Sequence, residues 1–315
     1  MENTKPKKKK NFINVLLVVL IIVAVCILGF SAYKLISINN SYQEASNLYA
    51  DIEAIVASPV EISVNKINTV NSAAADLKED ASEPAAEEEE TSSADKKEIV
   101  GTCLNDFRTS SLSWDFDALK KLCEDSVGYI YQKDKLSYPI VQAEDNDKYL
   151  RHLINGNYNT AGTLFVDYRL DEGLEGRYSI IYGHNMDDGS MFASLTNYAD
   201  EEYYKEHPYF EVFIGPHRYI YYVYAAARIE ENSDLFTFEM NDDEFLKLME
   251  YARSLNTYEM QPLQVTKDSH AILLSTCIDY PRNYDYRYVV MLVRGKELLD
   301  PSYNGKLPWI HRNKE

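Results

Sequence analysis

Two apolar stretches near the C-terminal end decide the fold of this chain: Ile272-Leu-Leu-Ser-Thr-Cys277 and Arg287-Tyr-Val-Val-Met-Leu-Val293. Both are rich in β-branched and large apolar residues, and a short polar connector separates them, which predicts two strands joined as a hairpin. In an antiparallel pair the end of the first strand lies beside the start of the second, so we expect the side chains of Cys277 and Arg287 to meet. A permanent cation beside a thiol favours the thiolate, and a guanidinium can also bind a developing oxyanion.

Nucleophilic cysteine chemistry also needs a group that gives a proton to a leaving amine, and histidine is the usual one. His184 is the best candidate, because it follows an apolar stretch and Gly183 and precedes a polar loop. Catalytic residues commonly lie at such strand exits, on the rim of a rigid sheet. Taken singly, each residue has a blander interpretation. Cys277 would be a buried small hydrophobe, His184 a packed or surface residue, and Arg287 an ordinary edge-strand charge.

Taken together, these residues resemble the motifs of the sortase family. Leu274-Ser-Thr-Cys277 resembles the nucleophile motif of that family, Tyr182-Gly-His184 resembles its histidine motif, and Arg287 resembles its arginine. Four further stretches resemble successive blocks of class B sortases in the family order, namely residues 125–130, 138–142, 162–167 and 185–192. The resemblance covers about residues 113–295. It departs from the commonest pattern at Ile278, where relatives often carry a polar residue.

The resemblance implies a mainly β fold of α+β type: a closed, mostly antiparallel β-barrel of about eight strands with peripheral helices. It also implies a cysteine transpeptidase. Cys277 would attack a Thr carbonyl in the C-terminal sorting motif of a secreted protein and form a thioester, while Arg287 stabilises the oxyanion and substrate and His184 acts as general acid and base. The acceptor would be an amine of a lipid-linked peptidoglycan precursor in a Gram-positive envelope. No cofactor would be needed.

Five further residues are predicted to contact substrate, because they lie next to these three in the sequence: Ser275, Thr276, Asp279, Tyr182 and Tyr286. Asp279 is placed to orient His184 or Arg287, or to face the acceptor. Most of the 26 tyrosines suit sheet packing, and those near the site could also line a peptide groove. No metal site is expected, since the histidines show no His-x-x-x-His spacing and the cysteines no Cys-x-x-Cys.

The N-terminus predicts a membrane anchor. Residues 1–11 form a basic tail with five lysines and one glutamate, and residues 12–33 carry no charge. About 20 helical residues cross a bilayer core, so this run is long enough to span it. Lysines favour the cytoplasmic side, which predicts a single-pass protein of the cell membrane with a cytoplasmic N-terminus and an extracellular catalytic domain. A signal peptide cut near Ser31 is the alternative.

Residues 34–112 are expected to form an extracellular stalk and an acidic disordered linker. Apolar residues recur at helical spacing over residues 41–56, which indicates either a continued membrane helix or a short amphipathic stalk, and we expect this apolar face to contact the core. Residues 76–98 contain ten acidic and three basic residues, a composition typical of a disordered spacer that holds the domain off the membrane. The catalytic domain is expected over residues 113–300, followed by a tail, residues 301–315.

Within the catalytic domain the clearest helix is residues 241–255, whose first turn is acidic and whose apolar stripe is Phe245, Leu248, Met249, Ala252 and Leu255. Two shorter helices are expected, one over residues 116–123 with Ser113 and Asp115 as candidate caps, and one over residues 192–198. The other strands are expected at residues 127–131, 138–141, 163–167, 209–213 and 219–228.

The net charge of −18 argues against nucleic acid as a partner. Secreted proteins with a sorting signal, the cell-wall precursor and the membrane are the expected partners. Two other functions stay open: a pilin-polymerising enzyme that joins proteins through a lysine, and a non-catalytic surface interaction module. Cys103 and Cys123 could pair outside the membrane, but Cys123 lies on an apolar helix face, so we expect free thiols.

Overall fold

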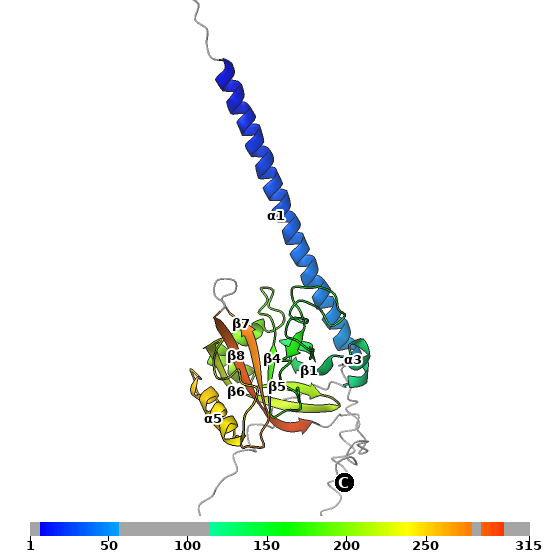
Figure 1. The fold of residues 1–315 in the computed structure, drawn as a ribbon, viewed down its shortest axis with the longest axis vertical. Coiled ribbons are helices and arrows are strands. Elements are labelled where there is room, and N and C mark those ends of the chain that lie inside the picture. The colour runs from blue at the N-terminus through cyan, green and yellow to red at the C-terminus, as the bar shows by residue number, and fades with distance from the viewer. Residues whose placement is uncertain (1–6, 57–113, 279–284, 299–315) are drawn as a thin grey trace, which may run out of the picture. The chain divides into compact units, whose positions relative to one another are not determined.

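The structure is a computed structural model that describes residues 7–56, 114–278 and 285–298 (Figure 1). Its elements, in chain order, are α1 Lys7–Val56, α3 Phe116–Leu122, β1 Ser126–Gln132, β2 Leu136–Val141, β3 Leu164–Val166, β4 Tyr178–Tyr182, the 3₁₀ helix η2 Ala193–Ala199, α4 Glu201–Glu206, β5 Tyr209–Ile214, β6 His217–Glu230, α5 Asp242–Ser254, β7 Ala271–Cys277 and β8 Tyr286–Leu298.

The eight strands close into a barrel in the order β1-β2-β3-β4-β7-β8-β6-β5 (Figure 1). The β2–β3 and β4–β7 neighbours run parallel, and the other neighbours run antiparallel. Residues 271–276 of β7 are all buried, and because both faces of the strand are covered, residues 271–274 form an unbroken apolar run. The predicted closed, mostly antiparallel barrel is therefore confirmed, and strands form at each of the predicted places.

The predicted helices form, with differences in detail. Asn241 caps α5 through a capping box with Glu244, and four residues of the predicted stripe are buried, whereas Leu255 is the C-cap and half-buried. Asp115 caps α3, as expected, but Leu122 is 47% exposed because that helix ends after seven residues. The helix after the histidine loop is the 3₁₀ helix η2, and α4, which follows it, was not predicted.

Helix α1 runs without interruption from Lys7 to Val56, so residues 41–56 continue the apolar helix, and the expected contact with the core also forms. Residues 14–40 are exposed, and by length and composition the apolar run that ends before Lys34 makes α1 a candidate membrane span. Near its C-terminal end, α1 buries Ala45, Tyr49, Ile52 and Val56 against the barrel.

The main-chain N–H of Asp115 donates to the carbonyl of Val56 at 3.0 Å. The chain on either side of residues 57–114 therefore meets at one place. The acidic segment, the tail after residue 298 and Cys103 lie outside the described residues. Cys123 is a free thiol whose sulfur lies 3.2 Å from the hydroxyl of Tyr149.

Candidate active site

Cys277 and Arg287 are directly paired across the β7–β8 ladder. Cys277 is the last residue of β7 and Arg287 the second of β8, and both side chains are half-buried at this end of the barrel. The antiparallel register brings the two together as the sequence predicted, since neighbouring positions on adjacent strands project to the same face. A thiol and a guanidinium thus share one edge of the sheet.

The loop that carries His184 is bound to the end of the nucleophile strand. Strand β4 runs parallel to β7, with Tyr182 beside Ser275. Three hydrogen bonds continue this pairing beyond β4: Gly183 N to the Ser275 carbonyl at 3.1 Å, Thr276 Oγ1 to the Gly183 carbonyl at 2.7 Å, and Asn185 Nδ2 to the Cys277 carbonyl at 3.1 Å. The residues on both sides of His184 are therefore tied to the last three residues of β7.

Gly183 is required by close packing rather than by its backbone conformation. A Cβ at this position would lie 2.3 Å from Leu164 Cδ2 and 2.7 Å from Phe192 Cδ2. Beyond it, the N–H of Phe192 donates to the His184 carbonyl at 2.8 Å, and Asn185 pairs with Met191. The histidine loop is thus a small hairpin closed at its base, which fixes the main chain of His184.

The imidazole of His184 has a defined tautomer. Its Nε2 lies 2.7 Å from the carbonyl oxygen of Leu150, and since a carbonyl can only accept, Nε2 carries a hydrogen. The other ring nitrogen, Nδ1, is then the one that can gain or lose a proton. Burial lowers the pKa of His184 from its ordinary value, and the nearby cation of Arg151 lowers it further, against the opposing effect of the Leu150 carbonyl.

Arg287 is held by a carboxylate that the sequence analysis did not identify. Its Nη2 lies 3.0 Å from Glu231 Oε2, and its Nη1 donates to the Tyr286 carbonyl at 3.0 Å. Glu231 follows β6, and its N–H donates to the Asp285 carbonyl at 2.8 Å, which ties that residue to the entry of β8. The two residues are 56 positions apart in the chain, so no local pattern points to this pair.

A cavity of about 320 Å³ lies beside Arg287. It is lined by Arg169, Tyr182, Glu231, Asn232, Ser233, Phe236, Phe238 and Arg287. The rings of Tyr182 and Phe236 are stacked with centroids 6.3 Å apart, and the Arg169 guanidinium lies 3.6 Å from the centroid of Phe238. The cavity therefore has aromatic walls and basic groups on its rim, together with one carboxylate.

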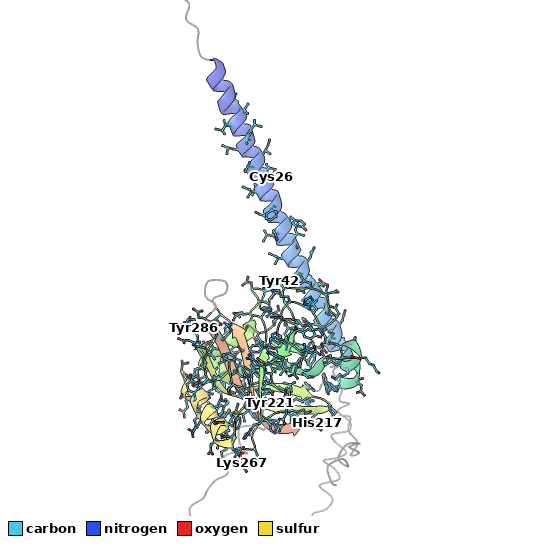
Figure 2. The ribbon with its side chains drawn as sticks, viewed as in Figure 1. Cys26, Tyr42, His217, Tyr221, Lys267 and Tyr286 are labelled. Carbon is cyan, nitrogen blue, oxygen red and sulfur yellow. The ribbon has the colours of Figure 1, made fainter. Side chains whose placement is uncertain are left out.

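The remaining predicted substrate contacts differ in position. Tyr182 lines the cavity, and its hydroxyl donates to Asp167 Oδ2 at 3.0 Å while burial raises its pKa. Ser275 and Thr276 are buried, so within the described structure they belong to the strand interior rather than to a surface that a peptide can reach. The ring of Tyr286 is covered by the Arg228 guanidinium at 4.0 Å and lies at the barrel end nearer the exposed part of α1 (Figure 2). Asp279 lies outside the described residues.

Comparison with known proteins gives a consistent result. A family model described as a sortase domain matches residues 132–294. Sortase B of Listeria monocytogenes is 34% identical over 181 residues, which are 56% of this chain and 72% of that protein. A sortase B structure from B. anthracis is 34% identical with a TM-score of 0.52, covering 57% of this chain and 84% of that one. The Staphylococcus aureus sortase B–substrate complex is 25% identical with a TM-score of 0.53 and the same coverage.

Proposed function

Because this chain is a cysteine transpeptidase that belongs to the sortase family, in class B, we propose that it cleaves secreted proteins after the Thr of a C-terminal sorting motif and joins them to an amine of a lipid-linked cell-wall precursor. Proteins with sorting signals and a cell-wall amine are the substrate classes of the family. The observation that carries the proposal is the direct pairing of Cys277 with Arg287, beside the loop of His184.

In the first half-reaction the Cys277 thiolate attacks the Thr carbonyl carbon. Arg287 supports this step because its N–H groups bind the oxygen that becomes negative. The C–N bond then breaks, and the departing nitrogen takes a proton from Nδ1 of His184. A lowered pKa suits this role, since it makes the imidazolium a stronger acid. The product is a thioester between Thr and Cys277.

In the second half-reaction the acceptor amine gives a proton to Nδ1 of His184 and attacks the thioester carbonyl. The new C–N bond forms as the C–S bond breaks, and the Cys277 thiolate is released for the next cycle. Atoms, charges and protons balance over the two steps without any cofactor. Arg287 binds the same carbonyl oxygen both times, so one oxyanion site serves both half-reactions.

The cavity beside Arg287 is proposed to receive the sorting motif. Its aromatic walls, Tyr182, Phe236 and Phe238, offer a flat apolar surface to a peptide. Arg287 lies on the cavity wall, so a motif bound there would present a carbonyl to the guanidinium. Tyr182 lines the cavity and is the last residue of β4, the strand that leads to His184, which supports the proposal.

The proposed topology puts the lysine-rich tail in the cytoplasm and the barrel outside, with the exposed apolar part of α1 in the bilayer. Both substrates would be held in that same membrane, one by its own C-terminal apolar tail and the other by its lipid. Confinement to one surface raises the effective concentration at which the enzyme and its two substrates meet.

The test uses the full-length protein in detergent with a set of candidate sorting peptides. Intact-mass spectrometry is expected to show a peptide adduct on Cys277 that disappears when an amine acceptor is added, and Cys277→Ala is expected to give neither adduct nor cleavage. Cleavage by the Cys277→Ala variant would refute the assignment of Cys277 as the nucleophile. A preference for a lysine side chain of a folded protein over a cell-wall peptide amine would favour the pilin-polymerising alternative. No adduct with any motif would favour the non-catalytic module.

A further inference from the structure

The docked part of α1 continues the exposed apolar part without a break. Between Ser31 and Val56 the helix contains neither proline nor glycine, the residues that most often kink or end a helix. Residues 14–40 are exposed, and the first buried side chain after them is that of Ala45. The barrel is therefore attached to the apolar segment by a rigid helix rather than by a flexible chain.

One face of α1 is packed on the barrel. Ala45, Tyr49, Ile52 and Val56 recur every three to four residues and are between 1% and 5% exposed. The Tyr49 hydroxyl donates to the Gly162 carbonyl and lies 3.1 Å from Thr163 Oγ1, and its ring packs edge-on against Tyr138 with centroids 5.1 Å apart. These contacts fix the middle of the docked segment.

Both ends of the docked segment are also fixed. At the membrane-side end, Asn159 Nδ2 donates to the Ser41 carbonyl at 2.9 Å and Asn157 Nδ2 donates to Glu44 Oε1 at 3.1 Å. At the other end, the Val56 carbonyl accepts from Asp115 at 3.0 Å. A helix held at both ends over residues 41–56, roughly 24 Å at 1.5 Å per residue, cannot pivot on the barrel.

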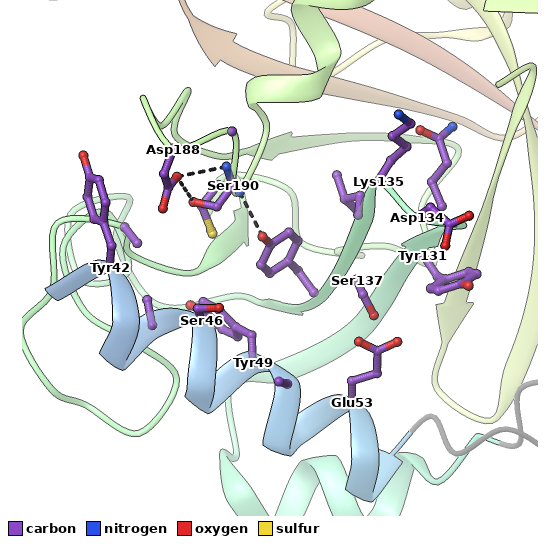
Figure 3. Close-up of a pocket in the computed structure, with 18 residues that line it drawn as sticks. Tyr42, Ser46, Tyr49, Glu53, Tyr131, Asp134, Lys135, Ser137, Asp188 and Ser190 are labelled. Atoms are coloured by element: carbon purple, nitrogen blue, oxygen red, sulfur yellow. Dashed lines mark hydrogen bonds between the residues drawn. The ribbon is translucent and has the colours of Figure 1, made fainter. Parts of the chain in front are cut away.

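The docked helix also lies next to the histidine loop. Figure 3 shows Tyr42, Ser46, Tyr49 and Glu53 of α1 along one wall of a cavity of about 580 Å³, and the other walls include Asp188 and Ser190. These two residues belong to the hairpin that His184 opens. The orientation of α1 is thus set against the same loop that positions the general acid.

The distance between the apolar segment and the barrel is short. Lys34 is the first charged residue after the apolar run, and Ser41 is the first residue bound to the barrel, so the connecting helix is about 10 Å long at 1.5 Å per residue. Figure 2 shows Tyr286, at the start of β8, at the barrel end nearer the apolar part of α1, and Lys267 at the opposite end. The candidate active site therefore faces the side from which α1 arrives.

From these observations we infer that α1 holds the active site at a fixed height above the bilayer and thereby selects substrates by length. This inference rests on the proposed function, in which the substrate is anchored by its own apolar tail. An extended chain spans at most about 3.3–3.6 Å per residue, so a site at fixed height needs a minimum number of residues between the cleaved bond and the tail. A substrate with fewer residues between the cleaved bond and its tail cannot place that bond at Cys277. A substrate with many more residues there reaches Cys277 at a lower effective concentration.

The experiment changes the helix and the substrate together. Full-length enzyme is placed in liposomes with a reporter that carries a sorting motif, a Gly/Ser spacer of variable length and a membrane-spanning tail, with triglycine as the soluble amine. Seven helix-forming residues are inserted between Asn39 and Asn40 of α1, which adds two turns, about 10 Å, and keeps the same face towards the barrel to within about 20°. The shortest spacer that supports cleavage is expected to increase by about three residues.

Two controls make the result decisive. A Gly/Ser insertion of the same length at the same place is expected to remove the sharp lower limit on spacer length, because a flexible chain lets the active site sample many heights above the bilayer. A soluble sorting peptide is expected to be cleaved at the parental rate by every variant. If the helical insertion leaves the minimal spacer unchanged while the soluble peptide is still cleaved, the length selection is wrong. If no variant cleaves the soluble peptide, the proposed function is wrong instead.

Discussion

The carboxylate of Glu231 binds the guanidinium of Arg287, with Nη2 and Oε2 3.0 Å apart. The pair joins the residue after β6 to the beginning of β8, and both residues line the same cavity. Because the Glu231 side chain is half-exposed, the pair adds little to the free energy of unfolding, about 0–1 kcal/mol. Its value lies in fixing the direction in which the guanidinium fork points.

The first prediction therefore concerns Glu231→Gln. We expect kcat/KM for sorting-peptide cleavage to fall by roughly 10-fold to 100-fold, the range for a modest misplacement of a catalytic group, while the melting temperature changes little. The matched control is Glu230→Gln, the adjacent exposed carboxylate at the end of β6. Glu231→Asp should recover part of the loss. If the substitutions at positions 230 and 231 lower kcat/KM equally, the cause is the change in surface charge rather than the positioning of Arg287.

Arg287→Lys tests the role of the guanidinium itself. The substitution keeps the charge but removes the two-pronged donor. If Arg287 binds the oxyanion, the rate of thioester formation should fall by roughly 100-fold or more, as when one oxyanion donor is lost. Single-turnover mass spectrometry measures this rate directly. A nearly normal rate in the Lys variant would mean that only the long-range charge of Arg287 matters.

Thr276 offers a test of the link between the nucleophile strand and the histidine loop. Its hydroxyl donates to the Gly183 carbonyl at 2.7 Å, and the side chain is buried. Thr276→Val keeps the shape but leaves that carbonyl without its donor, at a cost of about 1–3 kcal/mol in the free energy of unfolding, together with a lower kcat. Thr276→Ser keeps the hydroxyl and should preserve kcat. Chemical denaturation and steady-state kinetics give the two quantities.

His184 makes stability depend on pH. Burial lowers its pKa in the folded state below the ordinary value of 6.5, so the unfolded chain takes up a proton first as the pH falls. The contribution of this group to stability is complete above pH 6.5 and is lost as the pH falls through the window between 6.5 and the lower folded-state pKa. His184→Asn should therefore reduce the loss of stability on acidification. Arg151→Gln should raise the pKa of His184, as measured by NMR titration.

The acidic segment, residues 76–98, supplies a further test. Since α1 packs on the barrel and Val56 accepts a hydrogen bond from Asp115, the anchor helix contacts the barrel directly. Deleting residues 76–98 should leave both the cleavage of a soluble peptide and the attachment of a membrane-held substrate unchanged. If the deletion reduces attachment of the membrane-held substrate but not cleavage of the soluble peptide, the segment has the spacer role that its composition suggests. A loss of peptide cleavage would show that the segment supports the fold or the groove.

Patterns in the sequence alone predicted the strands, the β7–β8 hairpin and the strand-exit positions of Cys277, His184 and Arg287, whereas the closed barrel was expected from the resemblance to the sortase family. These features depend on patterns that lie within single strands and their exits, where alternating or continuous apolar residues fix which residues end a strand. The register followed as well, because a short connector leaves an antiparallel pair little freedom. The apolar anchor could be identified for the same reason, as a property of one continuous segment.

Only the tertiary structure decided which distant segments meet. Glu231 reaches Arg287 across 56 residues, and Tyr49 reaches Gly162 across 113. Helical spacing over residues 41–56 indicated an apolar face but not the surface that covers it, and no pattern in the sequence indicated that Val56 and Asp115 lie together. Such contacts form because apolar burial and hydrogen bonding stabilise any segment that is complementary to the surface of the closed barrel. Neither effect depends on how close the two segments are in the sequence.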